Sequence, residues 1–123
     1  MNNWTRKFAC AFKGLRYGAS GQSSFTIHFI IAIGVVALAT MLRCQRWEWC
    51  ILLACIGLVL TAEYLNSAIE HLARGLCDEE NESVGKALDT ASAAVLVAAF
   101  FAAWIGILIL GVRAIAVLQM WLV

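Results

Sequence analysis

The sequence predicts an all-α membrane protein, with an N-terminal interfacial amphipathic helix followed by three transmembrane helices. Of its 123 residues, 63% are hydrophobic and 14% are charged, and none is proline. Ordinary soluble domains are about 45–50% apolar and about 25% charged. Because so short a chain has too little interior to bury this many apolar side chains, the surplus indicates a lipid environment. We expect one membrane-embedded domain that covers residues 1–123.

Charge and cysteine usage exclude two classes of protein. The net charge is only +1, and no basic run is longer than Arg6-Lys7, which excludes a nucleic-acid partner. The five cysteines contain no CxxC pair, so we expect neither a disulfide framework nor a zinc site. Cys50 and Cys55 lie in apolar runs and are predicted to be small core residues.

Three nearly uncharged stretches are the predicted spans: residues 25–42, 49–62 and 90–112. The first contains His28 as its single ionisable side chain, and the other two contain none. A spanning helix needs about 20 mostly apolar residues. The outer stretches satisfy this requirement directly. The middle stretch is short unless its helix continues through Glu63 and Glu70, which would place two carboxylates on a membrane helix.

The N-terminal segment predicts a helix that lies in the membrane interface. Its apolar side chains recur at helical spacing, whereas its cations fall on the opposite side. Asn2 or Asn3 is the expected helix cap. We expect glycine and serine residues to break the helix before the first span. The apolar face contains Trp4, Phe8, Ala11, Phe12 and Leu15, the basic face contains Arg6, Lys13 and Arg16, and the predicted break contains Gly18, Ser20, Gly21, Ser23 and Ser24.

Two short connections join the spans. Residues 43–49 form a predicted turn whose tryptophans suit the membrane boundary, and residues 77–83 form an acidic loop. Four cations precede the first span, whereas the turn holds only Arg43 and Arg46. The positive-inside rule therefore favours a cytoplasmic N-terminus and acidic loop, with the C-terminus outside. The tail, residues 114–123, either prolongs the third helix or bends along the membrane surface.

Five polar side chains fall on one face of the second span: Glu63, Asn66, Ser67, Glu70 and Arg74. An ionisable group inside a membrane costs on the order of 2.5–3.5 kcal/mol, so such groups are functional candidates. The two glutamates lie two turns, or about 10 Å, apart and cannot share one proton, but they could hold opposite ends of one substrate complex. The alternative is a polar seam between helices, with Glu70 paired to Arg74.

A second polar face, formed by Lys86, Asp89 and Ser92, opens the third span, for which Ser83 is the expected N-cap. This face, Glu70 and the acidic loop would share one cytoplasmic boundary. Their oxygen ligands suit magnesium, which is normally shared between one or two carboxylates and substrate phosphates. The chain contains no GxxxxGK[ST] motif and no kinase-type glycine loop, so a standard phosphate-binding fold is excluded.

The segment Glu-Tyr-Leu-Asn-Ser-Ala-Ile-Glu at residues 63–70 resembles the signature of the prokaryotic diacylglycerol kinase and undecaprenol kinase family. In that family, Glu-x-x-Asn-Ser-Ala-aliphatic-Glu lies on the second of three transmembrane helices. The resemblance also covers Phe-x-x-Ala-Phe-x-Gly at residues 8–14, Gln-Ser-Ser-Phe-Thr-Ile-His at 22–28 and Gly-Lys-Ala-Leu-Asp at 85–89. It therefore extends over most of the chain.

The resemblance implies a lipid kinase that uses Mg²⁺ and ATP to phosphorylate the hydroxyl group of a membrane lipid. Diacylglycerol, which would become phosphatidic acid, is the first acceptor to expect, and undecaprenol is the second. The family is similar in forming homotrimers with shared active sites, and the small residues of the third span fit such close packing. The implied location is the bacterial inner membrane, with the active site on the cytoplasmic side.

Residue roles follow from the same resemblance. Glu63 matches the general base that acts on the lipid hydroxyl, and Asn66 belongs to the same catalytic face. Glu70 matches a magnesium ligand, and Gln22 stands where the family has a second metal-binding carboxylate. The expected nucleotide contacts are Glu79, Glu80, Asn81, Lys86 and Asp89, and the expected lipid contacts are Ser67 and Ser92.

Three positions depart from the family pattern. Gln22 replaces a glutamate and offers Mg²⁺ an oxygen without a charge. Arg74 stands where an aspartate is usual and Leu88 where a lysine is usual, so Arg74 and Lys86 are expected to take over phosphate contacts. Two alternatives stay open: a catalytically inactive relative, and a small ion- or proton-conducting subunit that uses the two signature glutamates as a relay.

Overall fold

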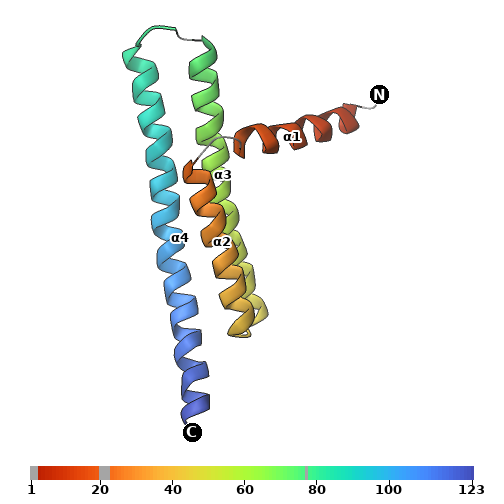
Figure 1. The fold of residues 1–123 in the computed structure, drawn as a ribbon, viewed down its shortest axis with the longest axis vertical. Coiled ribbons are helices and arrows are strands. Elements are labelled where there is room, and N and C mark those ends of the chain that lie inside the picture. The colour runs from red at the N-terminus through yellow and green to blue at the C-terminus, as the bar shows by residue number, and fades with distance from the viewer. Residues whose placement is uncertain (1–2, 20–22, 77) are drawn as a thin grey trace.

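The computed structural model describes residues 3–19, 23–76 and 78–123. Within these ranges every regular element is an α-helix: α1 (Asn3–Ala19), α2 (Ser23–Met41), α3 (Arg46–Leu76) and α4 (Glu82–Leu122). Helices α2, α3 and α4 run side by side, and α1 projects away from the bundle at a steep angle to its axis (Figure 1). The last three helices are long and apolar enough to cross a membrane. The predicted fold class, an all-α membrane protein, is confirmed.

Helix α1 presents its apolar side chains to the exterior. Trp4, Phe8 and Phe12 are all exposed, and the ammonium group of Lys7 lies 5.1 Å from the ring centre of Trp4. This surface is what a helix lying among lipid headgroups requires. The expected break is wrong at both of its ends, because Gly18 lies within α1 and Ser23 and Ser24 begin α2, while its residues 20 and 21 lie outside the described residues.

The connection between α2 and α3 is shorter than predicted. Helix α3 begins at Arg46, within the expected turn, because its first turn is capped locally. The carboxylate of Glu48 accepts a hydrogen bond from the backbone N–H of Gln45 at 2.8 Å, and the Gln45 carbonyl accepts one from the N–H of Trp49 at 3.0 Å. The Glu48 bond satisfies the Gln45 N–H, as the glutamate of a capping box does, and the Trp49 bond is the first backbone bond of the helix. Arg43, with φ of 53°, makes the reversal.

Helix α3 continues through both signature glutamates, which confirms the longer of the two predictions for the middle span. Its 31 residues extend about 46 Å, so the helix passes well beyond a hydrocarbon core of about 30 Å. The buried side chains recur along one face that meets the neighbouring helices. These are Glu48, Leu52, Val59, Glu63, Asn66 and Ser67.

Helix α4 begins at Glu82, and its N-cap is Asn81 instead of the predicted Ser83. The side-chain oxygen of Asn81 accepts hydrogen bonds from the backbone N–H groups of Ser83 and Val84, at 2.9 and 3.3 Å. Asparagine is among the strongest N-caps, so it starts the helix two residues earlier. The helix then runs without interruption to Leu122, so the tail prolongs it along its own axis.

The described cysteines, Cys10, Cys44, Cys50 and Cys55, are free thiols. The prediction of a core position is wrong for Cys50, which is exposed on α3, whereas Cys55 is half-buried. In a membrane helix the apolar residues surround the whole circumference, because lipid is also an apolar neighbour. An apolar run therefore does not reveal which side faces the protein.

Candidate functional site

Helix α1 is held against α3 through Gly18. A Cβ atom added at Gly18 would lie 2.5 Å from the Tyr64 ring, so only glycine allows this approach. The Tyr64 hydroxyl donates to the carbonyl of Leu15 at 3.0 Å, and the Ser67 hydroxyl donates to the carbonyl of Gly18 at 2.9 Å. Both bonds satisfy carbonyls at the end of α1. The predicted lipid contact Ser67 is thus buried and holds α1 in place.

Glu63 lies one helical turn before Ser67 on α3 and is 2% exposed. Its Oε1 is 2.5 Å from Nδ1 of His28, and its Oε2 accepts a hydrogen bond from the hydroxyl of Ser24 at 3.4 Å. Both partners belong to α2. A buried carboxylate is tolerated only when it is hydrogen-bonded, and α2 supplies these bonds. We call Ser24, His28, Glu63, Asn66 and Ser67 the polar junction.

His28 was not among the predicted site residues. A signal was present, because His28 is the one ionisable side chain in the otherwise apolar stretch 25–42. Its contact with Glu63 joins positions 35 residues apart in the sequence. No helical periodicity predicts such a pair.

Asn66 is 7% exposed and is only partly satisfied. Its side-chain nitrogen donates to Oε1 of Glu70 at 3.2 Å. Its side-chain oxygen is buried and has no hydrogen-bond partner among the described residues. An orphaned buried acceptor costs about 1–3 kcal/mol, so it indicates a place for a ligand that brings a donor or a cation.

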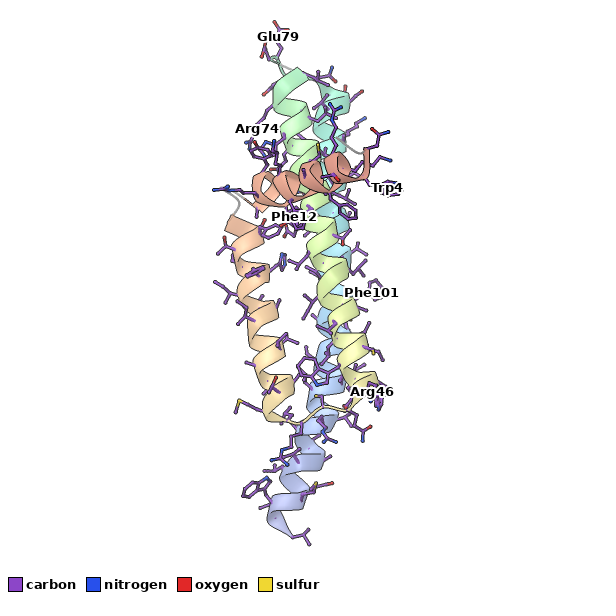
Figure 2. All side chains as sticks on the ribbon, turned by 90° about the vertical axis from the view of Figure 1, so that its right-hand side faces the viewer. Trp4, Phe12, Arg46, Arg74, Glu79 and Phe101 are labelled. Carbon is purple, nitrogen blue, oxygen red and sulfur yellow. The ribbon has the colours of Figure 1, made fainter. Side chains whose placement is uncertain are left out.

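A polar cleft lies where α3 and α4 are joined. Figure 2 shows Arg74 and Glu79 toward this end and Arg46 toward the other. The cleft contains four carboxylates against one guanidinium, so a triphosphate would be repelled unless a cation accompanied it. Its polar lining is Glu70, Arg74, Glu79, Glu80, Asn81 and Glu82.

The structure brings together some of the predicted nucleotide contacts but not all. Glu79, Glu80 and Asn81 line the cleft with Glu70, whereas Lys86 and Asp89 are absent from its lining. The ammonium group of Lys86 lies 3.4 Å from the Glu82 carboxylate, and both side chains are exposed. The Asn81 oxygen already caps α4.

The donor set near Glu70 fits a magnesium ion that arrives with phosphates. Within residues 3–19, 23–76 and 78–123 no group of three His, Cys, Asp or Glu side chains could enclose a metal ion. The Glu70 carboxylate and the free oxygen of Asn66 nevertheless offer two oxygen ligands. Mg²⁺ usually binds through one or two carboxylates, substrate phosphates and waters. Gln22, the other predicted ligand, lies outside the described residues.

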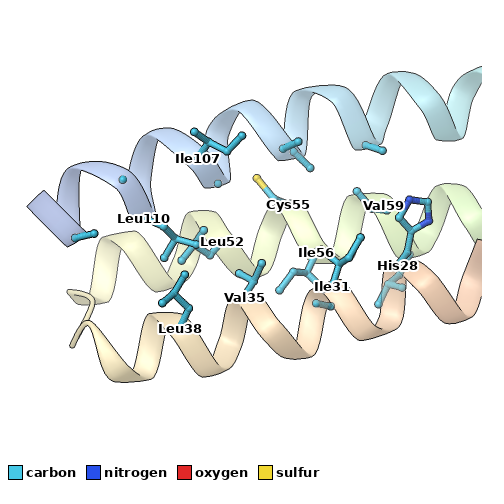
Figure 3. A pocket seen from close by; sticks show the side chains of 18 residues that line it. His28, Ile31, Val35, Leu38, Leu52, Cys55, Ile56, Val59, Ile107 and Leu110 are labelled. Atoms are coloured by element: carbon cyan, nitrogen blue, oxygen red, sulfur yellow. The ribbon is translucent and has the colours of Figure 1, made fainter.

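On the other side of the polar junction an apolar groove of about 640 Å³ runs between α2, α3 and α4. His28 lies at one end, and Leu38 and Leu110 lie toward the other (Figure 3). Small α4 residues leave the space open: Ala99, Ala102, Ala103, Gly106, Gly111 and Ala114. The predicted lipid contacts Ser67 and Ser92 do not line this groove.

The candidate site therefore has an order along α3. The groove leads to Glu63 with His28, then come Asn66 and Glu70, and the polar cleft with Arg74 lies beyond. From Glu63 to Arg74 the helix rises about 16 Å. Such an arrangement can hold an apolar substrate at one end and a charged one at the other.

Comparison with known proteins identifies clear relatives. The family model for prokaryotic diacylglycerol kinase matches residues 9–110. The undecaprenol kinase of Bacillus subtilis (strain 168) is 30% identical over 109 residues, which are 89% of each chain. The diacylglycerol kinase of Escherichia coli (strain K12) is 33% identical over 88 residues, which are 72% of each chain. That of Synechocystis is 30% identical over 100 residues, 80% of this chain and 57% of that protein.

Proposed function

This chain belongs to the prokaryotic diacylglycerol kinase family and is a lipid kinase, and we propose that it transfers the γ-phosphoryl group of ATP, with Mg²⁺, to the hydroxyl group of diacylglycerol. The observation that carries the proposal is the order of groups along α3. An apolar groove, a buried carboxylate, an oxygen pair and a polar cleft follow one another from membrane to water. Lipid and nucleotide would meet where these two environments join.

The lipid end supplies the basic group. A lipid whose chain lies in the groove would bring its hydroxyl to the level of His28, where Glu63 is held by two hydrogen bonds. Phosphoryl transfer needs little covalent help from the protein beyond positioning, charge neutralisation and acceptance of the hydroxyl proton. Glu63 supplies the negative charge that stabilises that proton.

The nucleotide end supplies oxygen ligands and one cation. Glu70 and Asn66 would hold a magnesium ion together with the phosphates, and Gln22 is the third expected ligand. When bound, the ion neutralises phosphate charge that the four carboxylates of the cleft would otherwise repel. Arg74 lines the cleft and would contact a phosphate there.

We also propose a homotrimer with shared sites in the bacterial inner membrane. Lys86 and Asp89 do not line the cleft of their own chain, which favours a site completed by a neighbouring chain. The cations of α1 favour a cytoplasmic N-terminus and put the polar cleft on the same side. Cross-linking in mild detergent should give a ladder that ends at three chains, and a ladder that stops at two would contradict the trimer.

Undecaprenol is the second candidate acceptor, and the extent of the groove favours it. On α2 the groove is lined from His28 to Leu38, a rise of about 15 Å, which equals the depth of one membrane leaflet. On α4 its lining runs farther, from Ala99 to Ala114, a rise of about 22 Å. A long polyprenyl chain would fill this far part, whereas a fatty acyl chain from the cytoplasmic leaflet would not.

A radiolabelled-ATP assay on the purified protein tests these proposals directly. Diacylglycerol and a polyprenol are offered side by side in the same micelles, with and without Mg²⁺. We expect label in lipid only when Mg²⁺ is present, and more in diacylglycerol. More label in the polyprenol would replace the acceptor. No label in either lipid would contradict the proposed reaction and favour an inactive or ion-conducting protein, which a flux assay in vesicles would then separate.

A further inference from the structure

His28 is the member of the junction that reaches the groove. Its side chain is 22% exposed and lines the groove, whereas Glu63 is 2% exposed and does not. Both carboxylate oxygens of Glu63 already have partners, His28 and Ser24. A hydroxyl group arriving through the groove would therefore meet the imidazole ring before the carboxylate.

The two ring nitrogens of His28 have different surroundings. Nδ1 faces Oε1 of Glu63. Nε2 forms no hydrogen bond with any described residue. When Nδ1 carries the hydrogen and donates it to the carboxylate, Nε2 carries a lone pair and can accept a proton. The contact with Glu63 selects this tautomer.

We propose that His28 is a catalytic residue, the base that takes the proton from the lipid hydroxyl, and that Glu63 acts through it. This inference rests on the proposed function and changes which atom meets the substrate. As the hydroxyl oxygen bonds to the γ-phosphorus, its proton passes to Nε2 of His28. The bond between the γ-phosphorus and its bridging oxygen breaks, and the electron pair leaves with ADP. The proton then returns to water.

The buried position of Glu63 supports this division of labour. Direct proton transfer to Glu63 would require its carboxylate to leave at least one of its two hydrogen bonds in a site almost without water. In the proposed arrangement the carboxylate stays in place, and its negative charge stabilises the imidazolium that forms beside it. Histidine is the side chain that most often serves as a general base.

Two substitutions that match each other in shape test the proposal. His28→Asn keeps a nitrogen donor at the position of Nδ1 but has no basic group. His28→Leu has the branched shape of asparagine and no donor. We expect both variants to lose about 100-fold or more in kcat, with the KM for ATP within about twofold of the wild type. An Asn variant that keeps more than about a third of the wild-type kcat would overturn the proposal, because donation to Glu63 would then suffice. A fully active Leu variant would overturn it as well.

Chemical rescue by imidazole distinguishes a catalytic role of His28 from a purely structural one. His28→Ala leaves space beside the groove, and free imidazole should raise its kcat at least about threefold while leaving wild type unchanged. Thermal unfolding in detergent, measured for each variant, shows whether a loss of activity follows from misfolding. A folded Ala variant that imidazole does not restore would count against His28 as the base.

The same assays separate the role of His28 from the lipid kinase reaction itself. If wild type labels no lipid, the proposed function fails first. If wild type is active and Glu63→Gln is inactive but the His28 variants are active, Glu63 is the base and only this inference is overturned. Imidazole should not restore Glu63→Gln, because its intact His28 already occupies the site.

Discussion

Helix α3 buries one glutamate in its first turn and another near its middle, and the two glutamates have different partners. Near the turn between α2 and α3, Glu48 accepts a hydrogen bond from the backbone of its own chain segment, at Gln45. At the polar junction, Glu63 is held by side chains of another helix, Ser24 and His28. The first arrangement is local and backbone-directed, and the second depends on tertiary packing.

The turn that we call the far turn, residues 42–45, uses its polar neighbours to satisfy backbone groups. Arg113 of α4 donates from Nε to the carbonyl of Leu42 at 2.9 Å and from a terminal nitrogen to that of Arg43 at 2.7 Å. A cation at a helix C-terminus is also favoured by the helix dipole. At the polar junction, in contrast, an Asn66 oxygen and a His28 nitrogen keep free bonding capacity. Buried polar groups thus satisfy the backbone at the far turn and keep unused bonding capacity at the polar junction.

The largest difference between the two regions is expected when each buried glutamate is replaced by glutamine. Glu63→Gln should lower kcat by about 100-fold or more while ATP binding persists, because it removes the charge that supports proton transfer at His28, and general-base catalysis contributes about 10²–10⁴-fold. Glu48→Gln should leave kcat within about threefold, since the amide oxygen still accepts from Gln45. Turnover and nucleotide binding are measured on the same preparations. Equal losses in both variants would show that burial, not chemistry, explains the effect.

The magnesium dependence distinguishes the role of Glu70 from that of the polar junction. Glu70→Gln removes the charge beside the free Asn66 oxygen and should raise the magnesium concentration for half-maximal rate about tenfold or more. Gln22→Glu restores a carboxylate and should lower that concentration. Rates are recorded against free Mg²⁺ at saturating ATP. If Gln22→Glu leaves the curve in place, Gln22 is not near the metal, and the acidic loop becomes the better candidate.

Two glycines of α1 provide a matched test of how this helix docks on the junction. Gly18→Ala places a methyl group 2.5 Å from the Tyr64 ring and should destabilise the fold by about 1–3 kcal/mol. Gly14→Ala meets no atom within 4 Å and should stabilise by about 0.5–1 kcal/mol, because alanine favours helix. Thermal unfolding in detergent gives both values. Similar stabilities for the two variants would contradict close packing of α1 on α3.

At the far turn we expect a smaller effect, on the reactivity of the Cys44 thiol. Burial raises the pKa of its thiol, the Glu48 carboxylate raises it further, and Arg113 lowers it. Because only the thiolate reacts, alkylation at pH 8 should be slow and should keep accelerating as the pH rises beyond the ordinary cysteine range. Glu48→Gln should lower this pKa and speed the reaction about two- to fivefold, for a charge interaction of ~0.5–1 kcal/mol. Mass spectrometry of the peptide that contains Cys44 measures the rate, and no change would remove Glu48 from its surroundings.

Local sequence patterns determined the helices, their amphipathic or apolar character and the polar face of α3. These features are local: residues three or four apart share a helix face whatever the helix packs against. Glu63, Asn66 and Glu70 therefore fell on one face before any packing was known. Helix ends were less predictable, because Asn81 competed with Ser83 as a cap and Glu48 started α3 early.

Tertiary structure alone decided how that face is completed. The pairing of His28 with Glu63 joins residues 35 apart, and the bond between Ser67 and Gly18 joins residues 49 apart. In lipid, apolar side chains gain little by choosing protein over membrane, so hydrophobicity does not specify which faces meet. Close approach at Gly18 and buried hydrogen bonds choose instead, and these depend on the fit of particular atoms across helices.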